Sequence, residues 1–568
     1  MFIYQKKIVW SFVFIVLFSG VYYFNNTNQD VIKVNEVVFV GDLTENKIIP
    51  KEDLECKDCN LVIISLTNTR KDHLSIYGYD RQTTPNIDNF FKNSLIFENA
   101  FAPASWTLPV ATSLYTSLFP YSHGIMDRYD GSVLSDDILT FTEILKENDY
   151  KLAGFTGGGD YNRSFNTMRG FDLYVDEENY IDFDIETFTE PTRGKHTAYL
   201  SIEKLVPLAS NWLKENKNSK KFLLLQGFDT HCPFEPKTPY DKKFDPDYSG
   251  DIDYSNCLWT FEQTDPTYDE NGIKSWVVQT PFKPKIEDKK VRFIYEEKIG
   301  GEVVKTWVIQ TSNAQEGDIE EIKLTKEEFE EMSNQGNGAN EVKITERDLE
   351  HMIALYDGEI AQADSYLEPF FKTIGELGLD KNTIFIFMAE HGDLFGEHGR
   401  FMRGGPLRGT FYDPVLNFPL LIKHPHIKEP IRLDYLMQAV DFMPTFLDIL
   451  GLKDPQKNTR QGKNLMPSFI NGKETNDYIY AASKFKAVNS PFFKGLSVVE
   501  VIRDKNWKLI KEEAFNTKTN EKKYELYELY NILEDPQEEN NLFGLEEEVF
   551  VNLQDNLKNF SVKALNAY

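Results

Sequence analysis

Four runs of apolar residues along the chain each have the length of a buried β-strand. They cover residues 60–66, 152–157, 221–228 and 382–389. Continuous apolar runs of this length are typical of parallel strands that are buried on both faces. Between them, apolar residues recur three and four positions apart, which predicts helices over 139–148 and 347–378. Strands that alternate with helices predict an α/β fold, in which a mainly parallel sheet is flanked by helices.

The alternation is interrupted between residues 249 and 341. Runs rich in β-branched and aromatic residues flank Gly300 and Gly301 there, which predicts a hairpin within a β-rich insert. Near the C-terminus, apolar and polar residues alternate over 498–510, which predicts a small sheet subdomain. The predicted organisation is an N-terminal targeting segment, a linker, a main domain with its insert and a C-terminal subdomain, at residues 1–24, 25–55, 56–450 (insert about 249–341) and 451–568.

The N-terminus has the pattern of a membrane-targeting segment. Lys6 and Lys7 precede an apolar run over 8–24, and a polar stretch follows. This order is typical of a secretory signal peptide or of a signal anchor. Ser19 and Gly20 lie inside the run and make a poor cleavage site, which favours an uncleaved, single-pass transmembrane helix. The basic flank then predicts a main domain outside the cytoplasm at the cell membrane, or a secreted one if the segment is cleaved.

Charge and cysteine content narrow the classes of partner and of site. The 568 residues include 62 Lys and Arg against 90 Asp and Glu, a formal net charge of −28, which argues against nucleic acid as a partner. Four cysteines are present, and Cys56 and Cys59 form a CxxC pair. No second ligand pair for zinc is evident, which favours a local disulfide over a metal site. Free thiols remain an alternative, also for Cys232 and Cys257.

Polar residues follow three of the predicted strands. Thr67 and Asn68 come after the first strand, residues 229–231 after the third, and residues 390–393 after the fourth. In open α/β sheets, ligands gather at the carboxyl ends of parallel strands, so we expect these clusters to converge on one site. Oxygen donors mixed with an imidazole suit a divalent ion such as calcium, magnesium, manganese or zinc.

The segment SWTLP, residues 105–109, allows two interpretations of Thr107. Ser105 and Thr107 precede Pro109 and an apolar, helix-compatible run. One interpretation is that their hydroxyls cap a helix that has proline in its first turn. The other is that Thr107 is a nucleophile, and SWTLP alone does not separate the two.

The wider sequence around these residues resembles the sulfatase family within the alkaline-phosphatase-like superfamily. The resemblance extends from about Asn60 to Leu542, outside the insert, and the matching motifs follow one another in the family's order. They are residues 60–90, 97–125, 155–159, 228–236, 355–364, 389–399, 411–422 and 528–542. The resemblance implies an alkaline-phosphatase-like core in which a nucleophile stands at the N-terminus of a helix and a divalent ion holds the ester.

The resemblance also assigns roles to individual residues. Thr107 falls on the position of the nucleophile. The metal-binding positions fall on Thr67, Asn68, Glu390 and His391, with calcium as the leading ion and zinc, manganese or magnesium as alternatives. His231 matches a histidine that contacts the ester, unless it only hydrogen-bonds its own turn. Arg408 matches a basic residue that neutralises the bound anion, with Arg403 as a competitor and a surface arginine as the plain alternative.

Three departures from the family's pattern bear on the chemistry. Sulfatases use a Cys or Ser that is converted to formylglycine in a motif that ends in Arg, whereas this chain has Thr107 and lacks the Arg. Thr67 and Asn68 stand where the family has carboxylates, and Glu390 stands where Asp is usual. An unmodified threonine is similar to the nucleophile of lipoteichoic acid synthases and phosphoethanolamine transferases. Fewer carboxylates predict weaker metal binding.

These observations lead to a main hypothesis and two alternatives. The main one is a hydrolase of sulfate or phosphate esters that uses Thr107 and one divalent ion, and acts on a small molecule, a glycan or an envelope component. The first alternative is a catalytically inactive binding protein on the same fold. The second is a phospho-transferase of the lipoteichoic acid synthase type, in which an alcohol replaces water as the acceptor.

Overall fold

The computed structural model describes the chain from residue 47 onwards, with gaps. The described residues are 47–126, 133–176, 200–250, 252, 266–269, 272–280, 289–299, 302–311, 319–324, 340–401, 411–487, 495–516, 519 and 521–565. The chain divides into two compact units, residues 1–44 and 45–568. The predicted membrane anchor over 8–24 lies outside the described residues and stays a prediction. Within the described part of the chain, no helix has the length and apolar character that a membrane span requires.

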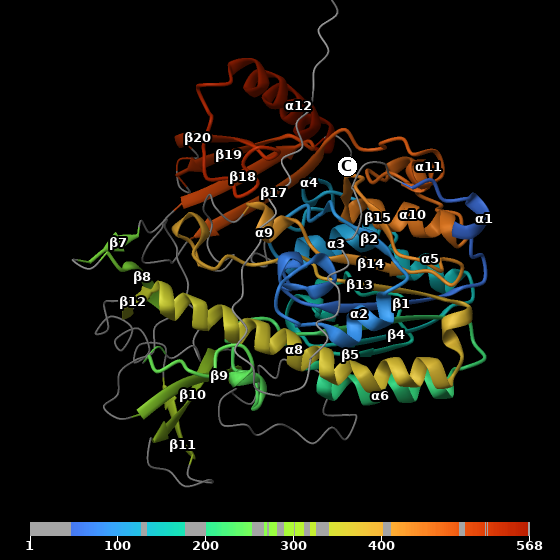
Figure 1. Ribbon diagram of the computed structural model, residues 1–568, viewed down its shortest axis with the longest axis horizontal. Coiled ribbons are helices and arrows are strands. Elements are labelled where there is room, and N and C mark those ends of the chain that lie inside the picture. Colours follow the sequence, from blue (N-terminus) through green and yellow to red (C-terminus); the bar gives the residue numbers. More distant parts are fainter. Residues whose placement is uncertain are drawn as a thin grey trace, which may run out of the picture. The chain divides into compact units, whose positions relative to one another are not determined.

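An eight-stranded sheet is the centre of the larger unit (Figure 1). The strand order is β15-β2-β14-β13-β1-β6-β4-β5, and only β14 runs antiparallel to the others. The four strands predicted from apolar runs are confirmed as β1, β4, β6 and β13. The bounds are Asn60–Leu66 (β1), Leu95–Phe97 (β2), Lys151–Thr156 (β4), Leu173–Val175 (β5), Lys221–Gly227 (β6), Thr383–Met388 (β13), Leu420–Lys423 (β14) and Ile431–Leu433 (β15).

Helices cover both faces of this sheet. Side chains along each buried strand point alternately to opposite sides, so apolar strands make both faces apolar and both must be buried. In β1, Leu61 and Ile63 belong to one apolar core and Val62 and Ile64 to the other. The first core includes side chains of α3, α5 and α10, and the second includes those of α2, α6 and α8. The predicted helices over 139–148 and 347–378 are confirmed as α5 and α8. The bounds are Pro85–Phe91 (α2), Thr107–Thr116 (α3), Phe141–Glu147 (α5), Ile202–Glu215 (α6), Glu346–Glu376 (α8) and Phe442–Ile449 (α10).

The predicted insert and the predicted C-terminal subdomain form smaller antiparallel sheets. The expected hairpin is present as the antiparallel pair β9 and β10, and β11 extends it. The alternating segment 498–510 is in fact a hairpin of β18 and β19, within a four-stranded antiparallel sheet that the sequence did not predict in full. The bounds are Thr267–Tyr268 (β7), Lys274–Thr280 (β8), Lys289–Ile299 (β9), Glu302–Thr311 (β10), Ile319–Leu324 (β11), Asn340–Thr345 (β12), Ile479–Ala487 (β17), Gly495–Arg503 (β18), Trp507–Phe515 (β19) and Lys522–Asn531 (β20).

The remaining elements are short, except for the C-terminal helix α12. They are Lys51–Leu54 (α1), Ala100–Phe101 (β3), Pro120–His123 (α4), Asp413–Leu416 (α9), Met437–Gln438 (β16), Met466–Asn471 (α11) and Glu547–Leu565 (α12). Helix α1 corrects the predicted linker over 25–55, since Ile49 and Leu54 are buried in the core. The backbone N–H of Ile49 also donates to the carbonyl of Phe469 at 2.8 Å. Because these apolar side chains are buried in the core, the residues around them belong to the folded domain. The linker is therefore shorter than its polar composition indicated.

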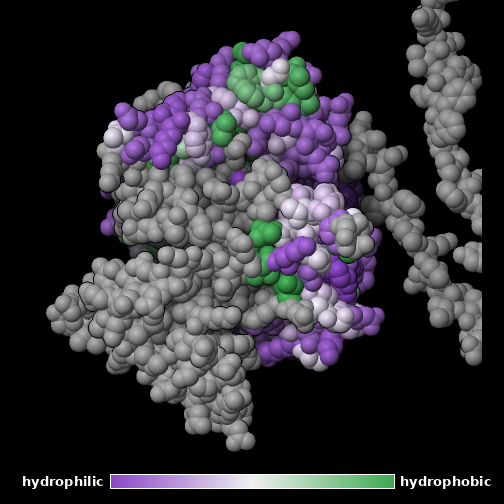
Figure 2. Space-filling view, turned by 90° about the vertical axis from the view of Figure 1, so that its left-hand side faces the viewer, coloured by the Kyte–Doolittle hydropathy of each residue, from purple (hydrophilic) through white to green (hydrophobic). Residues whose placement is uncertain are grey.

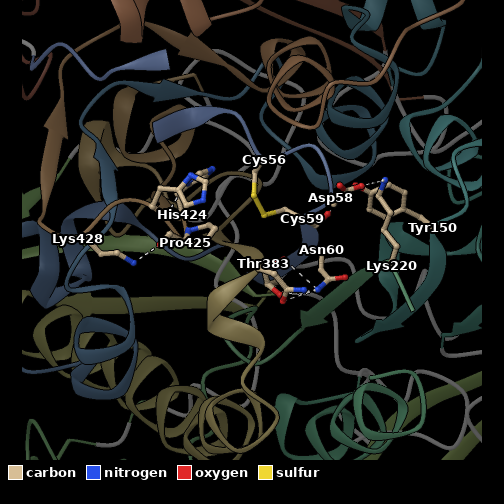
Figure 3. Close-up of a disulfide and its surroundings, with 12 residues drawn as sticks. Cys56, Asp58, Cys59, Asn60, Tyr150, Lys220, Thr383, His424, Pro425 and Lys428 are labelled. Carbon is tan, nitrogen blue, oxygen red and sulfur yellow. Dashed lines mark hydrogen bonds and ion pairs between the residues drawn. A yellow bond between two sulfur atoms is a disulfide. The ribbon is translucent and has the colours of Figure 1, made fainter. Parts of the chain in front are cut away.

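A disulfide joins Cys56 and Cys59 directly before β1 (Figure 3). The backbone N–H of Cys56 donates to the carbonyl of Ile449 at 2.8 Å, and the Tyr150 hydroxyl donates to the carbonyl of Cys59 at 2.9 Å. The predicted local disulfide is thus confirmed. Cys232 is disulfide-bonded as well, so the alternative of a free thiol is wrong for this residue.

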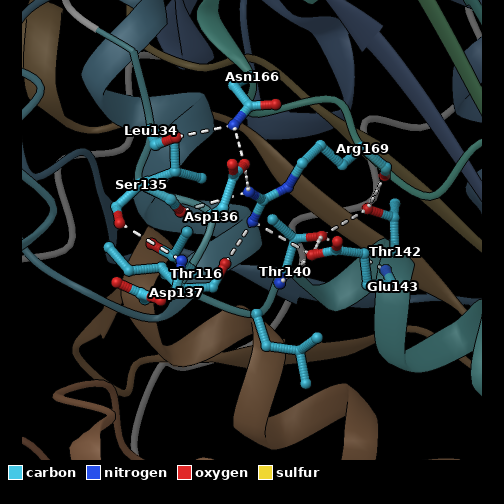
Figure 4. A network of polar contacts seen from close by, with 12 residues as sticks. Thr116, Leu134, Ser135, Asp136, Asp137, Thr140, Thr142, Glu143, Asn166 and Arg169 are labelled. Atoms are coloured by element: carbon cyan, nitrogen blue, oxygen red, sulfur yellow. Dashed lines mark hydrogen bonds and ion pairs between the residues drawn. The ribbon is translucent and has the colours of Figure 1, made fainter.

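Arg169 connects the loop before α5 to the first turn of that helix (Figure 4). Its guanidinium donates to the carbonyl of Ser135, to Asp136 at 3.0 Å and to Glu143 at 3.2 Å. Glu143 is at the same time part of the capping box of α5, with Thr140. One charged side chain therefore fixes the loop 133–138 against the start of a core helix.

The described surface is mostly polar, as the composition indicates. Figure 2 shows one face on which the coloured residues are largely hydrophilic, with small separate apolar areas. The most exposed large apolar side chains, Leu533 and Leu545, lie in the segment between β20 and α12. Single exposed apolar residues of this kind are ordinary on a protein surface.

A buried ion-pair cluster attaches the C-terminal sheet to the main domain. The Lys508 ammonium in β19 lies 3.0 Å from Asp413 and 2.7 Å from Glu538, and its side chain is fully buried. Arg503 in β18 lies 3.1 Å from Asp413. Glu538 also accepts the backbone N–H of Asp413 at 2.7 Å, at the first residue of α9. The cluster joins a strand, a loop near the C-terminus and a helix of the main domain.

We expect the variant Lys508→Ala to lower the free energy of unfolding by about 3–5 kcal/mol, because it leaves two carboxylates buried without their shared cation. Lys511→Ala is the matched control. Lys511 also pairs with two glutamates, but it is more exposed, and we expect a loss of about 1 kcal/mol. Denaturant unfolding of both variants measures the difference. Equal losses would show that the Lys508 cluster does not hold the two parts together.

Candidate functional site

Strand register brings the predicted polar clusters to one edge of the sheet. β1 pairs in parallel with β13, with Ser65 opposite Met388, so Thr67 and Glu390 follow at equivalent positions. β1 also pairs in parallel with β6, with Leu66 opposite Gly227, so the segment 229–231 leaves the sheet at the same edge. The convergence expected from the sequence is therefore present for all three clusters.

Thr107 faces His391 across this edge. Its hydroxyl oxygen lies 3.1 Å from Nε2 of His391, and both side chains are buried. Nδ1 of His391 lies 2.8 Å from the carbonyl oxygen of Gly392, which only accepts, so Nδ1 carries a proton. In the neutral imidazole, Nε2 then accepts the hydrogen bond of the Thr107 hydroxyl. This is the geometry of a hydroxyl nucleophile beside a proton acceptor.

The expected capping role of Thr107 is corrected by the structure. Helix α3 begins at Thr107 itself, and the N-cap position falls on Trp106, whose side chain forms no capping hydrogen bond. The backbone N–H of Leu108 donates instead to Oδ2 of Asp160, at 3.2 Å. A carboxylate from the loop after β4 takes the place of a local hydroxyl cap, which leaves the Thr107 hydroxyl directed at His391.

The turn after β1 is held in a left-handed conformation. Asn68 has φ 58°, and its side-chain amide donates to Asp393 at 3.1 Å while its oxygen accepts from the Thr67 hydroxyl at 3.3 Å. The Tyr356 hydroxyl in α8 donates to the carbonyl of Asn68 and accepts the backbone N–H of Arg70, each at 2.8 Å. Asn tolerates positive φ better than most residues. Asn68 is therefore suited both to the turn and to the contact with Asp393.

Glu390 makes this part of the site favourable for positive charge. It is 1 % exposed. Burial raises the pKa of Tyr161 well above its usual range, and the carboxylate of Glu390 raises it further. The same two causes raise the pKa of Tyr115. Burial disfavours any charge here, but the contribution of Glu390 comes from a negative potential, which attracts cations.

The donor set at this edge is chemically compatible with a divalent ion but carries little charge. Glu390 contributes a carboxylate, His391 an imidazole, and Thr67 and Asn68 neutral oxygens, all of which are buried. Among the described residues, no group of three or more His, Cys, Asp or Glu side chains is arranged to hold a metal. Hard divalent ions prefer several carboxylates. We therefore expect the ion to bind weakly at these residues.

Two predicted site residues remain, His231 and Arg408, and only His231 is among the described residues. His231 follows β6, its ring stacks on Phe228 with centroids 4.3 Å apart, and its Nδ1 lies 2.7 Å from the carbonyl oxygen of Cys232. It therefore makes the turn contact that was the plain alternative, although this does not test a role toward the ester. Arg408 and Arg403 lie outside the described residues.

Three residues of the site were missed from the sequence. Asp160 could have been found with the rule applied to the other strands, because it follows shortly after β4. Asp393 stands in the cluster of residues 390–393 but was not assigned a role of its own. Tyr356 had no usable signal, because only the packing of α8 beside the turn after β1 brings its hydroxyl to Asn68.

Helix α3 is further anchored by a buried histidine. The backbone N–H of Ile125 donates to Nδ1 of His123 at 3.1 Å, so Nε2 carries the proton and donates to the Ser113 hydroxyl at 3.0 Å. Burial lowers the pKa of His123 to about 3. The imidazole is thus held neutral, with Nδ1 as an acceptor and Nε2 as a donor.

Two family models match the chain. The sulfatase model matches residues 59–452. The model for the C-terminal region of N-sulphoglucosamine sulphohydrolase matches residues 396–563. The N-acetylglucosamine-6-O-sulfatase of Bacteroides thetaiotaomicron is 23 % identical over 514 residues, which are 86 % of this chain and 83 % of the relative. An arylsulfatase of Clostridium perfringens is 25 % identical over 442 residues, with coverage of 75 % and 82 %.

Solved structures share the fold. A protein in complex with its substrate D-glucosamine-2-N,6-O-disulfate gives a TM-score of 0.58 at 18 % identity, covering 89 % of this chain and 98 % of that chain. The phosphonate monoester hydrolase of Agrobacterium radiobacter gives a TM-score of 0.58 at 19 % identity, covering 89 % and 95 %. These likenesses confirm the predicted alkaline-phosphatase-like fold with a small antiparallel C-terminal sheet.

We expect His123 to make the protein less stable as the pH falls. The folded pKa lies below the unfolded value of 6.5, so stability is complete above 6.5 and is lost progressively between 6.5 and about 3. From about pH 7 to about pH 5, the wild type should lose roughly 2 kcal/mol more than His123→Gln. Denaturant unfolding at both pH values measures this. The exposed His426 provides the control variant His426→Gln, and a His123→Gln variant as pH-sensitive as the wild type would contradict the expectation.

Proposed function

The chain belongs to the sulfatase family of sulfate-ester hydrolases, and from this premise we propose that it acts with unmodified Thr107 as its nucleophile. The observation that carries the proposal is the 3.1 Å contact between the Thr107 hydroxyl and Nε2 of His391. A hydroxyl becomes nucleophilic when an adjacent group accepts its proton. The position of Thr107 at the first residue of α3 adds the partial positive charge of a helix N-terminus.

The proposed reaction has two steps. The Thr107 oxygen attacks the sulfur atom while Nε2 of His391 takes the hydroxyl proton, and the sulfur–oxygen bond to the alcohol breaks. Nε2 of His391 gives this proton to the leaving oxygen, so the alcohol departs neutral and Thr107 carries the sulfuryl group. Water then attacks the sulfur atom and gives one proton to Nε2 of His391, the bond from sulfur to the Thr107 oxygen breaks, and His391 returns the proton to that oxygen, which releases hydrogen sulfate. Because Nδ1 donates to Gly392, the imidazole stays oriented toward Thr107 throughout.

Glu390, Thr67 and Asn68 are the residues that we propose would hold a divalent ion, with calcium as the leading candidate. His391 can join them only when its Nε2 does not accept from Thr107, because one lone pair cannot serve both. When bound, such an ion supplies Lewis-acid polarisation of the ester oxygens. The carboxylate of Glu390 supplies the charge that attracts it, and the neutral oxygens complete the set.

We propose a sulfated sugar or glycan as the substrate. Support comes from the relative named as an N-acetylglucosamine-6-O-sulfatase and from the structural neighbour in complex with a disulfated glucosamine. The neighbour that is a phosphonate monoester hydrolase keeps phosphorus esters within the proposal. A catalytically inactive binding protein would be recognised by the outcomes of the assay below.

We expect Thr107→Ala to lower kcat for hydrolysis of an aryl sulfate at least about 10³-fold, because the attacking oxygen is lost. Release of the phenol from an aryl sulfate measures the rate. Thr116→Ala is the matched control, since Thr116 lies in the same helix and its hydroxyl donates to the carbonyl of Thr112 at 2.7 Å, within the helix itself. An inactive wild type that still binds the ester would favour the binding protein. Equal activity of Thr107→Ala and the wild type would exclude Thr107 as the nucleophile.

We expect Glu390→Gln to abolish the stabilisation that added calcium gives the wild type, since it removes the one carboxylate proposed as a ligand. Melting temperatures with and without calcium, zinc, manganese and magnesium, together with bound metal content, provide the measurement. Glu359→Gln, at a buried glutamate of α8 that accepts the backbone N–H of Glu235, is the control. An ion that stabilises Glu390→Gln as much as the wild type does not bind at Glu390.

A further inference from the structure

Asp160 places a negative charge directly beside the candidate nucleophile. Its Oδ2 accepts the backbone N–H of Leu108 at 3.2 Å, and Leu108 is the residue after Thr107. The side chain is buried, with 6 % of its surface exposed. It reaches α3 from the short turn Gly159–Tyr161 that follows β4. The turn itself is held in place by the Tyr174 hydroxyl, which donates to the carbonyl of Tyr161 at 2.6 Å.

This arrangement changes what the N-terminus of α3 offers to a substrate. The free N–H groups at the start of a helix ordinarily attract an anion. Here one of them already binds a carboxylate of the protein. An anionic ester that reaches Thr107 therefore lies close to the charge of Asp160, which is held at the residue next to Thr107.

Electrostatic repulsion depends on the charge that the ester carries. Sulfate esters and phosphonate monoesters carry one negative charge, whereas a phosphate monoester carries close to two above its second pKa of about 6. Coulomb energy is proportional to the product of the charges, so the dianion is repelled about twice as strongly at the same distance. Metal or cationic groups at the site shift the absolute affinity for both kinds of ester, but the contribution of Asp160 still differs between them.

We propose that Asp160 is a specificity-determining residue that makes the site favour monoanionic esters over dianionic phosphate monoesters. The inference rests on the proposed function, because it concerns the same site. Membership of the family does not by itself decide between sulfate and phosphate esters. The inference is that the buried carboxylate of Asp160 decides between them.

The test compares three p-nitrophenyl esters that share one leaving group: the sulfate, the phenylphosphonate and the phosphate. Asp160→Asn keeps an oxygen that can accept from Leu108 and removes only the charge. At about pH 8, where the phosphate ester is a dianion, we expect kcat/KM for the phosphate relative to the sulfate to rise about ten-fold in this variant. The ratio of the phenylphosphonate to the sulfate should stay the same, because both are monoanions.

Asp364→Asn is the matched control. Asp364 is buried and accepts the backbone N–H groups of Asn86 and Ile87, at 3.0 and 2.8 Å, at the start of α2. The chemical change and its helix-terminal setting are the same, but α2 does not carry the nucleophile, so the ratio of the phosphate to the sulfate should not change. Asp160→Ser, a shorter neutral acceptor, replaces the Asn variant if that variant does not fold.

The outcomes separate this inference from the proposed function. A wild type that hydrolyses the sulfate, with an unchanged ratio in Asp160→Asn, overturns the role of Asp160 and leaves the hydrolase standing. A wild type without turnover overturns the hydrolase. In that case, calorimetric binding of phenyl sulfate and phenyl phosphate still tests Asp160, since the variant should gain affinity for the dianion more than for the monoanion.

Discussion

The parallel pairing of β1 with β13 on one side and with β6 on the other is the constraint on which the site depends. Hydrogen bonds between parallel strands fix their register, so the residues after Leu66, Gly227 and Met388 leave the sheet together. Without this register, Thr67, His231 and Glu390 would be unrelated polar residues in three loops. The helix that carries Thr107 packs on one face of the same sheet, which places its first residue against His391.

The site at this edge of the sheet differs from the expected family pattern in where its carboxylates lie. Neutral oxygens of Thr67 and Asn68 stand where the resemblance led us to expect carboxylates, while Asp160 and Asp393 add carboxylates at other points. Asp393 holds the amide of Asn68, and Asp160 holds the start of α3. Carboxylates that a metal would use in a sulfatase are thus partly replaced by carboxylates that position backbone and side chains.

The C-terminal sheet contributes stability through charge as well as through apolar packing. Lys508 is buried between Asp413 and Glu538, and Asp413 begins the helix α9, which directly precedes β14 of the main sheet. Arg503 nearby lowers the pKa of Asp413 to about 2, together with Lys508 and against the effect of burial. A cluster of this kind ties the sheet β17–β20 to one orientation on the main domain, because its partners come from both.

The sequence by itself determined the fold class and the strand ends. Apolar runs of strand length between segments of helical period leave few architectures other than a layered α/β sheet, and polar residues at the ends of β1, β6 and β13 point to the edge where they meet. It also indicated the local disulfide of Cys56 and Cys59. These features depend on residues that are close in the sequence, where periodicity and spacing are direct signals.

Only the tertiary structure decided which of these residues touch. Thr107 and His391 are 284 positions apart, and Asn68 and Asp393 are 325 apart. The structure also moved the cap of α3 from Thr107 to Asp160, and it brought the Tyr356 hydroxyl of α8 to the turn after β1. Contacts of this kind follow from how helices pack on the sheet. Many side chains of the two cores determine that packing jointly, so no local pattern in the sequence encodes it.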